Sequence, residues 1–281
     1  TTIEQALDHL TEFGYDAKVL AGGQSLIPMM NFRLAQPSVL VDLNRVPELS
    51  YIEAVENGGL RIGAMTRHHQ VEYDPLVAER APLIHATMPG IATPQIRSRG
   101  TFGGSIAHAD PAAELTAVSV VLDGQFRVQS RNGERWVPAS DFFVGMFTTV
   151  LEPDELLTEI SFPPLAPRTG WAMQEVARRA GDFALVGVAA VVTLDNKNLC
   201  DHARMLFFSV GDGPVEAHQA VDVLKGQEPS LEVIRAASEK VDGDIDPGSD
   251  IHASADYRRH LAKVLAYRTL EQAFDRAKED A

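Results

Sequence analysis

Cysteine is nearly absent from this sequence, and its scarcity excludes several kinds of site. Cys200 is the only cysteine in 281 residues, so no disulfide forms within the chain. An iron–sulfur cluster typically needs about four thiolate ligands, so any cluster that works with this chain has to lie on another polypeptide. No apolar run reaches the roughly 18 residues of a membrane-spanning helix, and no signal-type segment opens the sequence. These absences predict a cytoplasmic protein that does not associate with membranes.

Positive charge is also in short supply. The chain has 25 Lys and Arg residues against 39 Asp and Glu residues, which gives a net charge of −14 and a pI near 5.0. A polyanion such as nucleic acid or an anionic membrane is repelled by such a protein. We therefore expect no nucleic-acid partner, and we expect any bound anion to be small. Because the sequence begins at Thr1 and not at Met, we also expect that residues precede it in the full-length protein.

The dinucleotide fingerprint Gly-x-Gly-x-x-Gly is missing, but the sequence contains two glycine pairs. Residues 19–26 end an apolar run with Gly22-Gly23 and continue to Ser25, and residues 101–105 place a second pair between two hydroxyl residues. Glycine has no Cβ, so its backbone N–H groups can approach a phosphate closely. A single pair is more often just a turn. Two similar pairs indicate a ligand with two phosphates.

Two carboxylates, Asp110 and Glu114, follow the second pair. A carboxylate beside a phosphate is repelled by it, so these side chains are better suited to accept hydrogen bonds from sugar or polyol hydroxyls. Phosphates together with a polyol predict a nucleotide cofactor. No Ser–His–Asp set, catalytic carboxylate pair or metal-ligand cluster is evident, so we assign no catalytic residue and no metal site.

The motifs carry a family resemblance. Residues 21–26 (AGGQSL), 97–105 (RSRGTFGGS), 110–115 (DPAAEL) and 178–184 (RRAGDFA) occur in the order that is found in the FAD-binding medium subunit of molybdenum hydroxylases. That family includes carbon monoxide dehydrogenase and the FAD domain of xanthine dehydrogenase. The resemblance extends over essentially the whole chain. It implies an oxidoreductase subunit with FAD as its cofactor.

The resemblance also implies partners. A large molybdopterin subunit and a small 2Fe–2S subunit would join this chain as a dimer of heterotrimers, a heterohexamer. Electrons would pass from the partners through FAD to an external acceptor such as NAD, oxygen or a quinone. Neither the substrate nor the acceptor is specified by this sequence.

The same resemblance implies an α+β fold. It predicts a two-part FAD-binding domain of the vanillyl-alcohol-oxidase/CO-dehydrogenase flavoprotein type over residues 1–165, with subdomains of about 1–50 and 51–165. A C-terminal α+β domain, with a three-stranded antiparallel sheet and helices, is expected over 168–281. The residue pattern agrees, because the proline-rich segment 163–167 is a natural boundary. Three strand-like runs and three helical segments follow it.

The expected FAD contacts cluster in the two glycine motifs, in the acidic segment and at a few separate positions. By resemblance they are Lys18, Leu20, Ala21, Gly22, Gly23, Gln24, Ser25, Leu26, Ile91, Ala92, Thr101, Gly103, Gly104, Ser105, Ala107, His108, Asp110, Glu114, Leu157 and Gln174. The backbone at 91–93 is expected near the isoalloxazine, and Leu157 against the flavin. Gln174 occupies a position where many members have a lysine. A neutral amide could stabilise a reduced flavin only by hydrogen bonding.

Two arginines near the second glycine pair have two possible roles, and one long segment is predicted to be helical. Arg97 and Arg99 either neutralise the diphosphate or form surface salt bridges. Residues 66–88 have the pattern of a helix.

Two other functions remain as alternatives. A stand-alone FAD-dependent oxidase of the vanillyl-alcohol type would need a substrate pocket of its own, for which 281 residues leave little chain. A flavin-free scaffold subunit would not need the intact glycine pairs.

Overall fold

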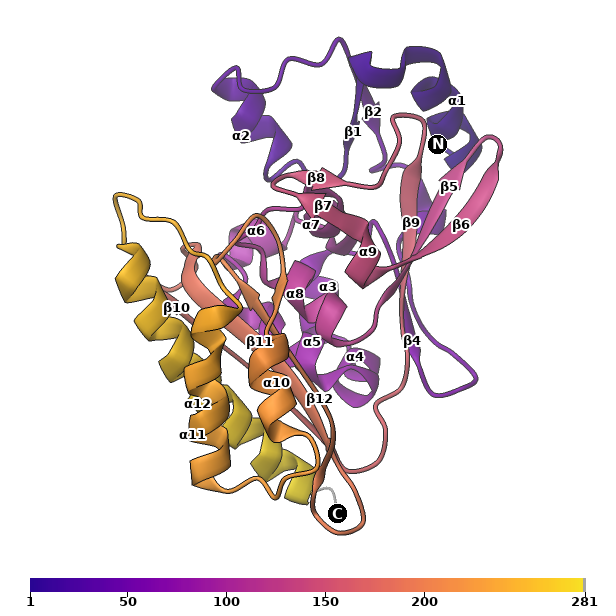
Figure 1. Cartoon of the computed structure of the whole chain (residues 1–281). Coiled ribbons are helices and arrows are strands. Elements are labelled where there is room, and N and C mark those ends of the chain that lie inside the picture. The colour runs from indigo at the N-terminus through magenta and orange to yellow at the C-terminus, as the bar shows by residue number, and fades with distance from the viewer. Residues whose placement is uncertain (280–281) are drawn as a thin grey trace. The chain divides into compact units, whose positions relative to one another are not determined.

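The computed structural model describes residues 1–279, which form two compact units (Figure 1). The first unit contains residues 1–109 and 123–164, and the second contains residues 110–122 and 165–279.

The first unit begins with a small strand–helix–strand layer. Helix α1 (Ile3–Phe13) starts where the Thr2 hydroxyl accepts a hydrogen bond from the N–H of Gln5, and it stops at Gly14, whose φ is 48°. These are the start and stop signals that the sequence shows. Strand β1 (Ala17–Leu20) then pairs in parallel with β2 (Val39–Asp42), and the short helix α2 (Leu26–Asn31) connects them.

A five-stranded antiparallel sheet forms the larger part of the first unit. Its strand order is β3-β4-β9-β5-β6. The strands are β3 (Ile52–Ala54), β4 (Leu60–Gly63), β9 (Leu156–Phe162), β5 (Gln125–Ser130) and β6 (Gly133–Pro138). A short helix α9 (Ala139–Phe142) and a separate hairpin of β7 (Phe143–Gly145) and β8 (Thr148–Thr149) follow β6. Phe126 of β5 packs edge-on against Phe142, with ring centroids 4.7 Å apart, and both side chains are fully buried.

Short helices lie between β4 and β5 in the sequence. They are α3 (His68–Tyr73), α4 (Pro75–Arg80), α5 (Pro82–Thr87), α6 (Pro94–Arg97) and α7 (Phe102–His108). The helix expected over 66–88 is thus three helices, because Pro75 and Pro82 each begin a new one. Proline lacks an N–H and fits the first helical turn, and the Asp74 carboxylate caps α4 by accepting from the N–H of Leu76 at 2.8 Å.

The second unit is built on a four-stranded antiparallel sheet in the order β10-β11-β12-β13. The strands are β10 (Thr169–Ala177), β11 (Ala184–Leu194), β12 (Cys200–Phe208) and β13 (Val215–Glu216). The C-terminal sheet was expected to have three strands, and the two-residue β13 adds a fourth. Its helices are α8 (Glu114–Val121), α10 (His218–Leu224), α11 (Leu231–Lys240) and α12 (Ala255–Glu279), and a 3₁₀ turn lies at Val241–Gly243. In the first unit, 3₁₀ turns lie at Gly14–Asp16, Pro47–Leu49 and Met88–Gly90.

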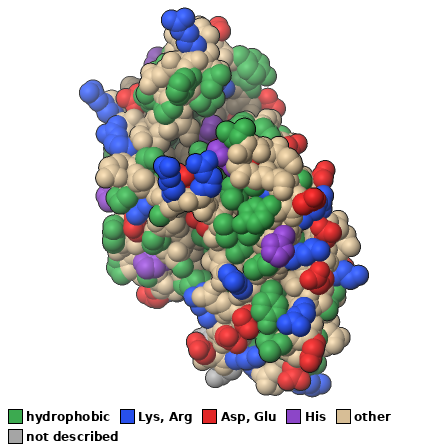
Figure 2. All heavy atoms as spheres, turned by 90° about the vertical axis from the view of Figure 1, so that its left-hand side faces the viewer, with side chains coloured by type: hydrophobic (Ala, Val, Ile, Leu, Met, Phe, Trp, Pro, Cys, Tyr) green, Lys and Arg blue, Asp and Glu red, His purple; other side chains and the backbone are tan. Residues whose placement is uncertain are grey.

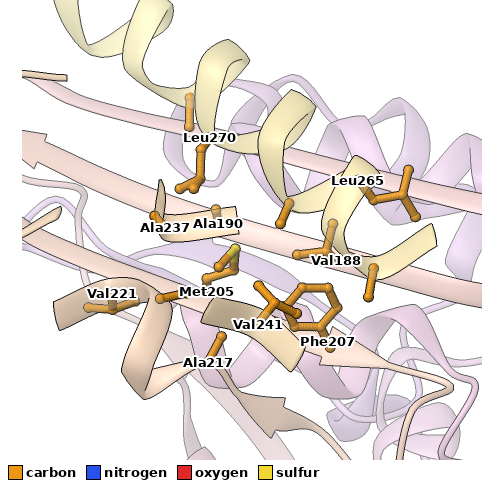
Figure 3. Packing of buried hydrophobic residues seen from close by; sticks show 14 of the residues in the cluster. Val188, Ala190, Met205, Phe207, Ala217, Val221, Ala237, Val241, Leu265 and Leu270 are labelled. Atoms are coloured by element: carbon orange, nitrogen blue, oxygen red, sulfur yellow. The ribbon is translucent and has the colours of Figure 1, made fainter. Parts of the chain in front are cut away.

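One face of this sheet carries the main hydrophobic core of the second unit. Figure 3 shows Val188 and Ala190 of β11 and Met205 of β12 beneath Leu265 and Leu270 of α12. Helices α10 and α11 add Val221 and Ala237 to the same cluster, and Figure 1 shows α11 and α12 running along the sheet. Alternate strand residues face this layer, as the two-residue period of a strand requires.

The other face of the sheet is covered by α8. Arg204 of β12 donates a hydrogen bond to the carbonyl of Val120 in α8 at 2.6 Å. All eight residues of α8 are buried, so this helix needs neighbours on every side. Residues 110–122 accordingly pack with the second unit.

The exposed surface is mixed in character. On the face in Figure 2, acidic and basic side chains are interspersed with hydrophobic ones. Within residues 1–279, no helix is both long and apolar enough to cross a bilayer. The same residues contain no group of three or more His, Cys, Asp or Glu side chains placed to hold a metal ion.

Candidate functional site

The two glycine pairs, about 80 residues apart in the sequence, meet in the first unit. A methyl group added at Gly22 would lie 2.4 Å from the carbonyl oxygen of Arg99 and 2.8 Å from the Cα of Gly100. A methyl group at Gly104 would lie 3.4 Å from the Cβ of Ala21. The backbone of the first turn therefore packs directly on the segment that leads into the second pair, and only glycine permits the approach at Gly22.

The first glycine turn leaves its backbone donors open. Among the described residues, no acceptor is bonded to the N–H groups of residues 22–25. Gly23 has a φ of 73°, in the left-handed region, and its carbonyl accepts from the N–H of Ile27 at 3.1 Å. Four successive free N–H groups before a helix are the arrangement that binds an anion in many proteins.

A cleft of about 440 Å³ opens at this turn. Its lining combines apolar side chains, three amides and one guanidinium: Leu20, Ala21, Gly22, Gly23, Gln24, Ile27, Pro28, Asn31, Asn44 and Arg99. The Arg99 side chain makes no hydrogen bond or salt bridge to any described residue. Lys18 is exposed on β1, Ser25 is the N-cap residue of α2, and Leu26 begins that helix. The cleft thus offers free N–H groups and a positive charge beside an apolar wall.

The second glycine pair is used differently, because its N–H groups already have partners. Gly103 donates to the carbonyl of Ala64 at 2.9 Å, and Gly104 donates to the hydroxyl of Thr101 at 3.1 Å. Thr101 is the N-cap residue of α7, so the pair forms the first turn of a helix. A methyl group at Gly103 would lie 2.5 Å from the Cβ of Ala64. The expectation that both pairs present open N–H groups is therefore met at the first pair only.

Asn44 and Arg67 connect the two turns, and neither was predicted from the sequence. The Asn44 amide nitrogen donates to the carbonyl of Ala21 at 3.0 Å, and its oxygen accepts from Arg67 at 2.6 Å. Arg67 also donates to the carbonyl of Arg99. Asn44 could have been found, because β1 and β2 are parallel and their carboxyl ends meet at one edge of the sheet. Nothing in the sequence around Arg67 distinguishes it from a surface arginine.

Arg97 and Arg99, two residues apart, have opposite environments. The Arg97 guanidinium is buried and forms a two-pronged pair with the carboxylate of Glu72, at 2.7 Å and 3.1 Å. Its third nitrogen donates to the carbonyl of Ile91 at 2.9 Å, which holds the turn at Ile91 and Ala92. Arg97 therefore forms a salt bridge, which was one of the two alternatives, but this salt bridge is buried and not at the surface. Arg99 alone remains available to an anion.

Several predicted contacts lie around the second turn. His108 ends α7, and its ring centroid lies 5.1 Å from that of Phe147. Ala107 is exposed and Ser105 is partly buried on the same helix. Behind the turn, the buried ring of His68 would lie 3.0 Å from a methyl group at Gly100, and burial lowers the pKa of His68 to about 4.

Leu157, which was also predicted as a contact, is buried in β9.

The predicted acidic residues belong to the second unit. Asp110 accepts a hydrogen bond from the N–H of Ala112 at 2.9 Å, and Glu114 begins α8. Burial raises the pKa of Glu114 to about 7, with a further contribution from the charge of Glu175, and burial raises the pKa of Glu175 to about 7 as well. Glu114 is therefore partly protonated near neutral pH, so its carboxyl group can donate as well as accept.

Gln174 lies on a different face of β10 from its neighbour Glu175. Its amide donates to Gln272 of α12 at 3.4 Å, and it lines a cleft of about 360 Å³ along that helix. Strand alternation turns Glu175 to the face that α8 covers. The structure therefore groups Glu175, and not Gln174, with Glu114.

Two family models and several known proteins match this chain. Residues 1–165 match the FAD binding domain in molybdopterin dehydrogenase, and residues 171–273 match the CO dehydrogenase flavoprotein C-terminal domain. The chain is 40% identical to the 6-hydroxypseudooxynicotine dehydrogenase complex subunit alpha of Paenarthrobacter nicotinovorans, over 99% of this chain and 93% of that protein. It is 38% identical to the carbon monoxide dehydrogenase medium chain of Hydrogenophaga pseudoflava, over 98% and 95%.

Solved structures show the same relationship. A chain of carbon monoxide dehydrogenase from Hydrogenophaga pseudoflava superposes with a TM-score of 0.94 at 38% identity, covering 98% of this chain and 95% of that one. Quinoline 2-oxidoreductase from Pseudomonas putida 86 gives 0.93 at 36% identity, covering 98% and 95%. The predicted fold and family are therefore confirmed: this chain belongs to the FAD-binding medium-subunit family of the molybdenum hydroxylases, which are oxidoreductases.

Proposed function

We propose that this chain binds FAD with the diphosphate at the first glycine turn. The observation that carries the proposal is the run of four open N–H groups at residues 22–25, beside the unpaired guanidinium of Arg99. A diphosphate needs several convergent donors and a positive charge. The first turn and Arg99 supply both without backbone donors from the second glycine pair. The apolar wall at Leu20, Ile27 and Pro28 fits a flat aromatic group better than a phosphate.

The other predicted contacts keep their assigned roles as proposals. Thr101, Ser105 and Asp110 would contact the ribitol or a phosphate, Glu114 would bind a hydroxyl, and His108 would lie beside the cofactor. Ile91, Ala92 and Leu157 would lie near the flavin ring. Gln174 is the weakest of these assignments, because its amide is directed toward Gln272.

We further propose that the chain carries electrons between partner subunits and an external acceptor. When bound, FAD supplies reversible two-electron chemistry. The residues of this chain contribute binding, orientation and the local charge around the cofactor. With Cys200 as its only cysteine, and buried, the chain has no ligands for an iron–sulfur cluster. A large molybdopterin subunit and a small 2Fe–2S subunit, in a dimer of heterotrimers, would therefore complete the electron path to NAD, oxygen or a quinone.

The identity of the oxidised substrate is not expected to depend on this chain. Proteins named for 6-hydroxypseudooxynicotine, carbon monoxide and nicotine are 40%, 38% and 42% identical to it. Carbon monoxide has no chemistry in common with the two pyridine compounds that one cleft could select. We infer that substrate recognition lies on the molybdopterin subunit.

Purification of the chain alone, followed by addition of FAD, tests the proposal. We expect a flavin absorption band that stays with the protein through gel filtration, and no substrate oxidation by the isolated chain. Turnover by the isolated chain would instead indicate the stand-alone oxidase. Failure to retain FAD would indicate the flavin-free scaffold. Co-purification with a large and a cysteine-rich small polypeptide would support the three-subunit enzyme.

A further inference from the structure

Arg67 is a half-buried cation that the proposed chemistry does not yet use. It is the N-cap residue of α3, and its guanidinium reaches across to two separate segments. One nitrogen donates to the carbonyl of Arg99, and another donates to the side-chain oxygen of Asn44 at 2.6 Å. The planar, two-pronged donor of an arginine suits such a bridge, whereas a lysine cannot reproduce it.

Asn44 extends the bridge to the first glycine turn. Its amide nitrogen donates to the carbonyl of Ala21 at 3.0 Å and to the carboxylate of Asp42 at 2.6 Å. The side chain is thus oriented from both ends, since its oxygen has Arg67 as donor and its nitrogen has two acceptors. A continuous path runs from Ala21 through Asn44 and Arg67 to Arg99. It joins the residue before Gly22 to the residue before Gly100.

The charges along this path are unbalanced. Arg67 and Arg99 are close enough that, after burial, the charge of Arg99 is the main factor lowering the pKa of Arg67. Asp42 is the opposing carboxylate, and its pKa is lowered, first by the backbone N–H of Asn44. Two guanidinium groups against one carboxylate leave a net positive charge beside open N–H groups, in a protein of net charge −14. An anion is the group that balances them.

We propose that Arg67 and Asn44 are positioning residues that hold the first glycine turn against residues 99–100 and so keep its N–H groups aimed at a diphosphate. The inference rests on the proposed FAD function, and Arg99 supplies the charge that meets the diphosphate. Without the bridge, the carbonyls of Ala21 and Arg99 lose their donors, and the turn at residues 22–25 is free to open. FAD affinity then falls because the turn has to be ordered on binding.

Variants of the full-length chain test the bridge by two readouts. FAD affinity is measured by quenching of flavin fluorescence, and amide hydrogen exchange of residues 20–26 and 98–101 is measured on the FAD-free chain. We expect Arg67→Met to weaken FAD binding about 10- to 100-fold, the range for the loss of about one hydrogen bond to a charged group. Arg67→Lys keeps the charge but not the two prongs, so we expect it to resemble Arg67→Met. Asn44→Ala is expected to speed exchange at residues 20–26 without FAD present.

The controls separate this inference from the proposed function. Arg131→Met removes an exposed arginine that pairs with Asp8 at 2.9 Å in the same unit, and we expect it to leave both readouts unchanged. The bridge is overturned if Arg67→Lys binds FAD as tightly as the wild type, or if exchange at residues 20–26 is unaffected in Asn44→Ala. A wild-type chain that does not bind FAD would refute the proposed function, while the exchange data would still decide whether the bridge orders the turn. Should Arg67→Met fail to fold, the lysine and Asn44 variants carry the test.

Discussion

The N–H groups of Gly22 and Gly23 have no acceptor among residues 1–279, whereas those of Gly103 and Gly104 donate to Ala64 and Thr101. In the sequence the two pairs look alike, since each is followed by a serine and each was expected to bind a phosphate. In the structure the two pairs differ in what surrounds their backbone. The first pair ends a strand at an open edge, and the second begins a helix that packs on β4. A glycine pair thus indicates close backbone approach, but it does not say whether a ligand or the protein approaches.

The largest expected effect of a substitution in either pair is on the free energy of unfolding. Gly103→Ala places a methyl group 2.5 Å from the Cβ and 2.7 Å from the Cα of Ala64, and neither atom can move without the backbone. We expect a loss of about 3 kcal/mol or more in the free energy of unfolding, at the upper end of overpacking costs. Urea denaturation followed by circular dichroism measures it. Gly145→Ala is the matched control, because nothing lies within 4 Å of its added methyl group. Equal stability of the two variants would contradict the packing role.

The ring of His68, behind the second turn, predicts an acid-sensitive fold. Its pKa is lowered by burial from 6.5 to about 4, so between these values the unfolded chain binds a proton that the folded chain does not. The free energy of unfolding should therefore fall as the pH drops from about 6.5 to about 4, by about 2–3 kcal/mol. His68→Asn should flatten this dependence, and His69→Asn, at an exposed position, should not. An unchanged slope in His68→Asn would show that another group is responsible.

Glu114, which follows the second pair, predicts the opposite dependence. Its pKa is raised by burial from 4.5 to about 7, so between these values the folded chain binds a proton that the unfolded chain does not. Stability is then fully present below about pH 4.5 and is lost as the pH rises through about 7. We expect Glu114→Gln to raise the free energy of unfolding at pH 8 by about 1–3 kcal/mol. Denaturation at pH 5 and pH 8 measures it, and a gain at pH 5 equal to that at pH 8 would exclude the carboxyl group as its cause.

The sequence predicted the elements whose causes are local. The three-stranded sheet expected for the C-terminal domain is present as β10, β11 and β12, and the Thr2 cap and the stop at Gly14 also have local causes. The family motifs indicated the glycine turn at residues 22–25, and its role as an FAD site stays a prediction. The break of residues 66–88 at Pro75 and Pro82 was also local, and the proline positions could have shown it.

What could not be predicted depends on contacts between distant segments. The Asn44–Arg67 bridge joins residues 23 positions apart, and Arg97 pairs with Glu72 from 25 positions away. Whether an arginine is free, like Arg99, or buried in a salt bridge, like Arg97, is decided by the partner and not by the residue. The same applies to the second glycine pair, because Ala64 lies where a side chain at position 103 would be.

A substitution at Gly23 should affect ligand binding more than folding. Its φ of 73° is a conformation that β-branched residues avoid and that asparagine tolerates. An added Cβ would meet only the flexible side chains of Ile27 and Leu20, at 3.1 Å and 3.3 Å. We expect Gly23→Val to weaken FAD binding about tenfold or more, and Gly23→Asn to stay within about threefold of the wild type. Fluorescence titration measures both, and equal affinities would place FAD away from this turn.

The smallest effect is expected at Thr101, and it decides whether the second pair touches the ligand at all. Thr101→Val removes the hydroxyl that caps α7 at Gly104 and should cost about 1 kcal/mol of stability, while Thr101→Ser keeps the oxygen and should cost less. If the second pair only packs, FAD affinity in Thr101→Val stays within about twofold of the wild type, because no ligand contact is lost. A tenfold loss of affinity in a variant that is still folded would mean that the Thr101 hydroxyl binds FAD, as the family resemblance implies. In that case both turns contact FAD, the first turn through its backbone N–H groups and the second through the side-chain hydroxyl of Thr101.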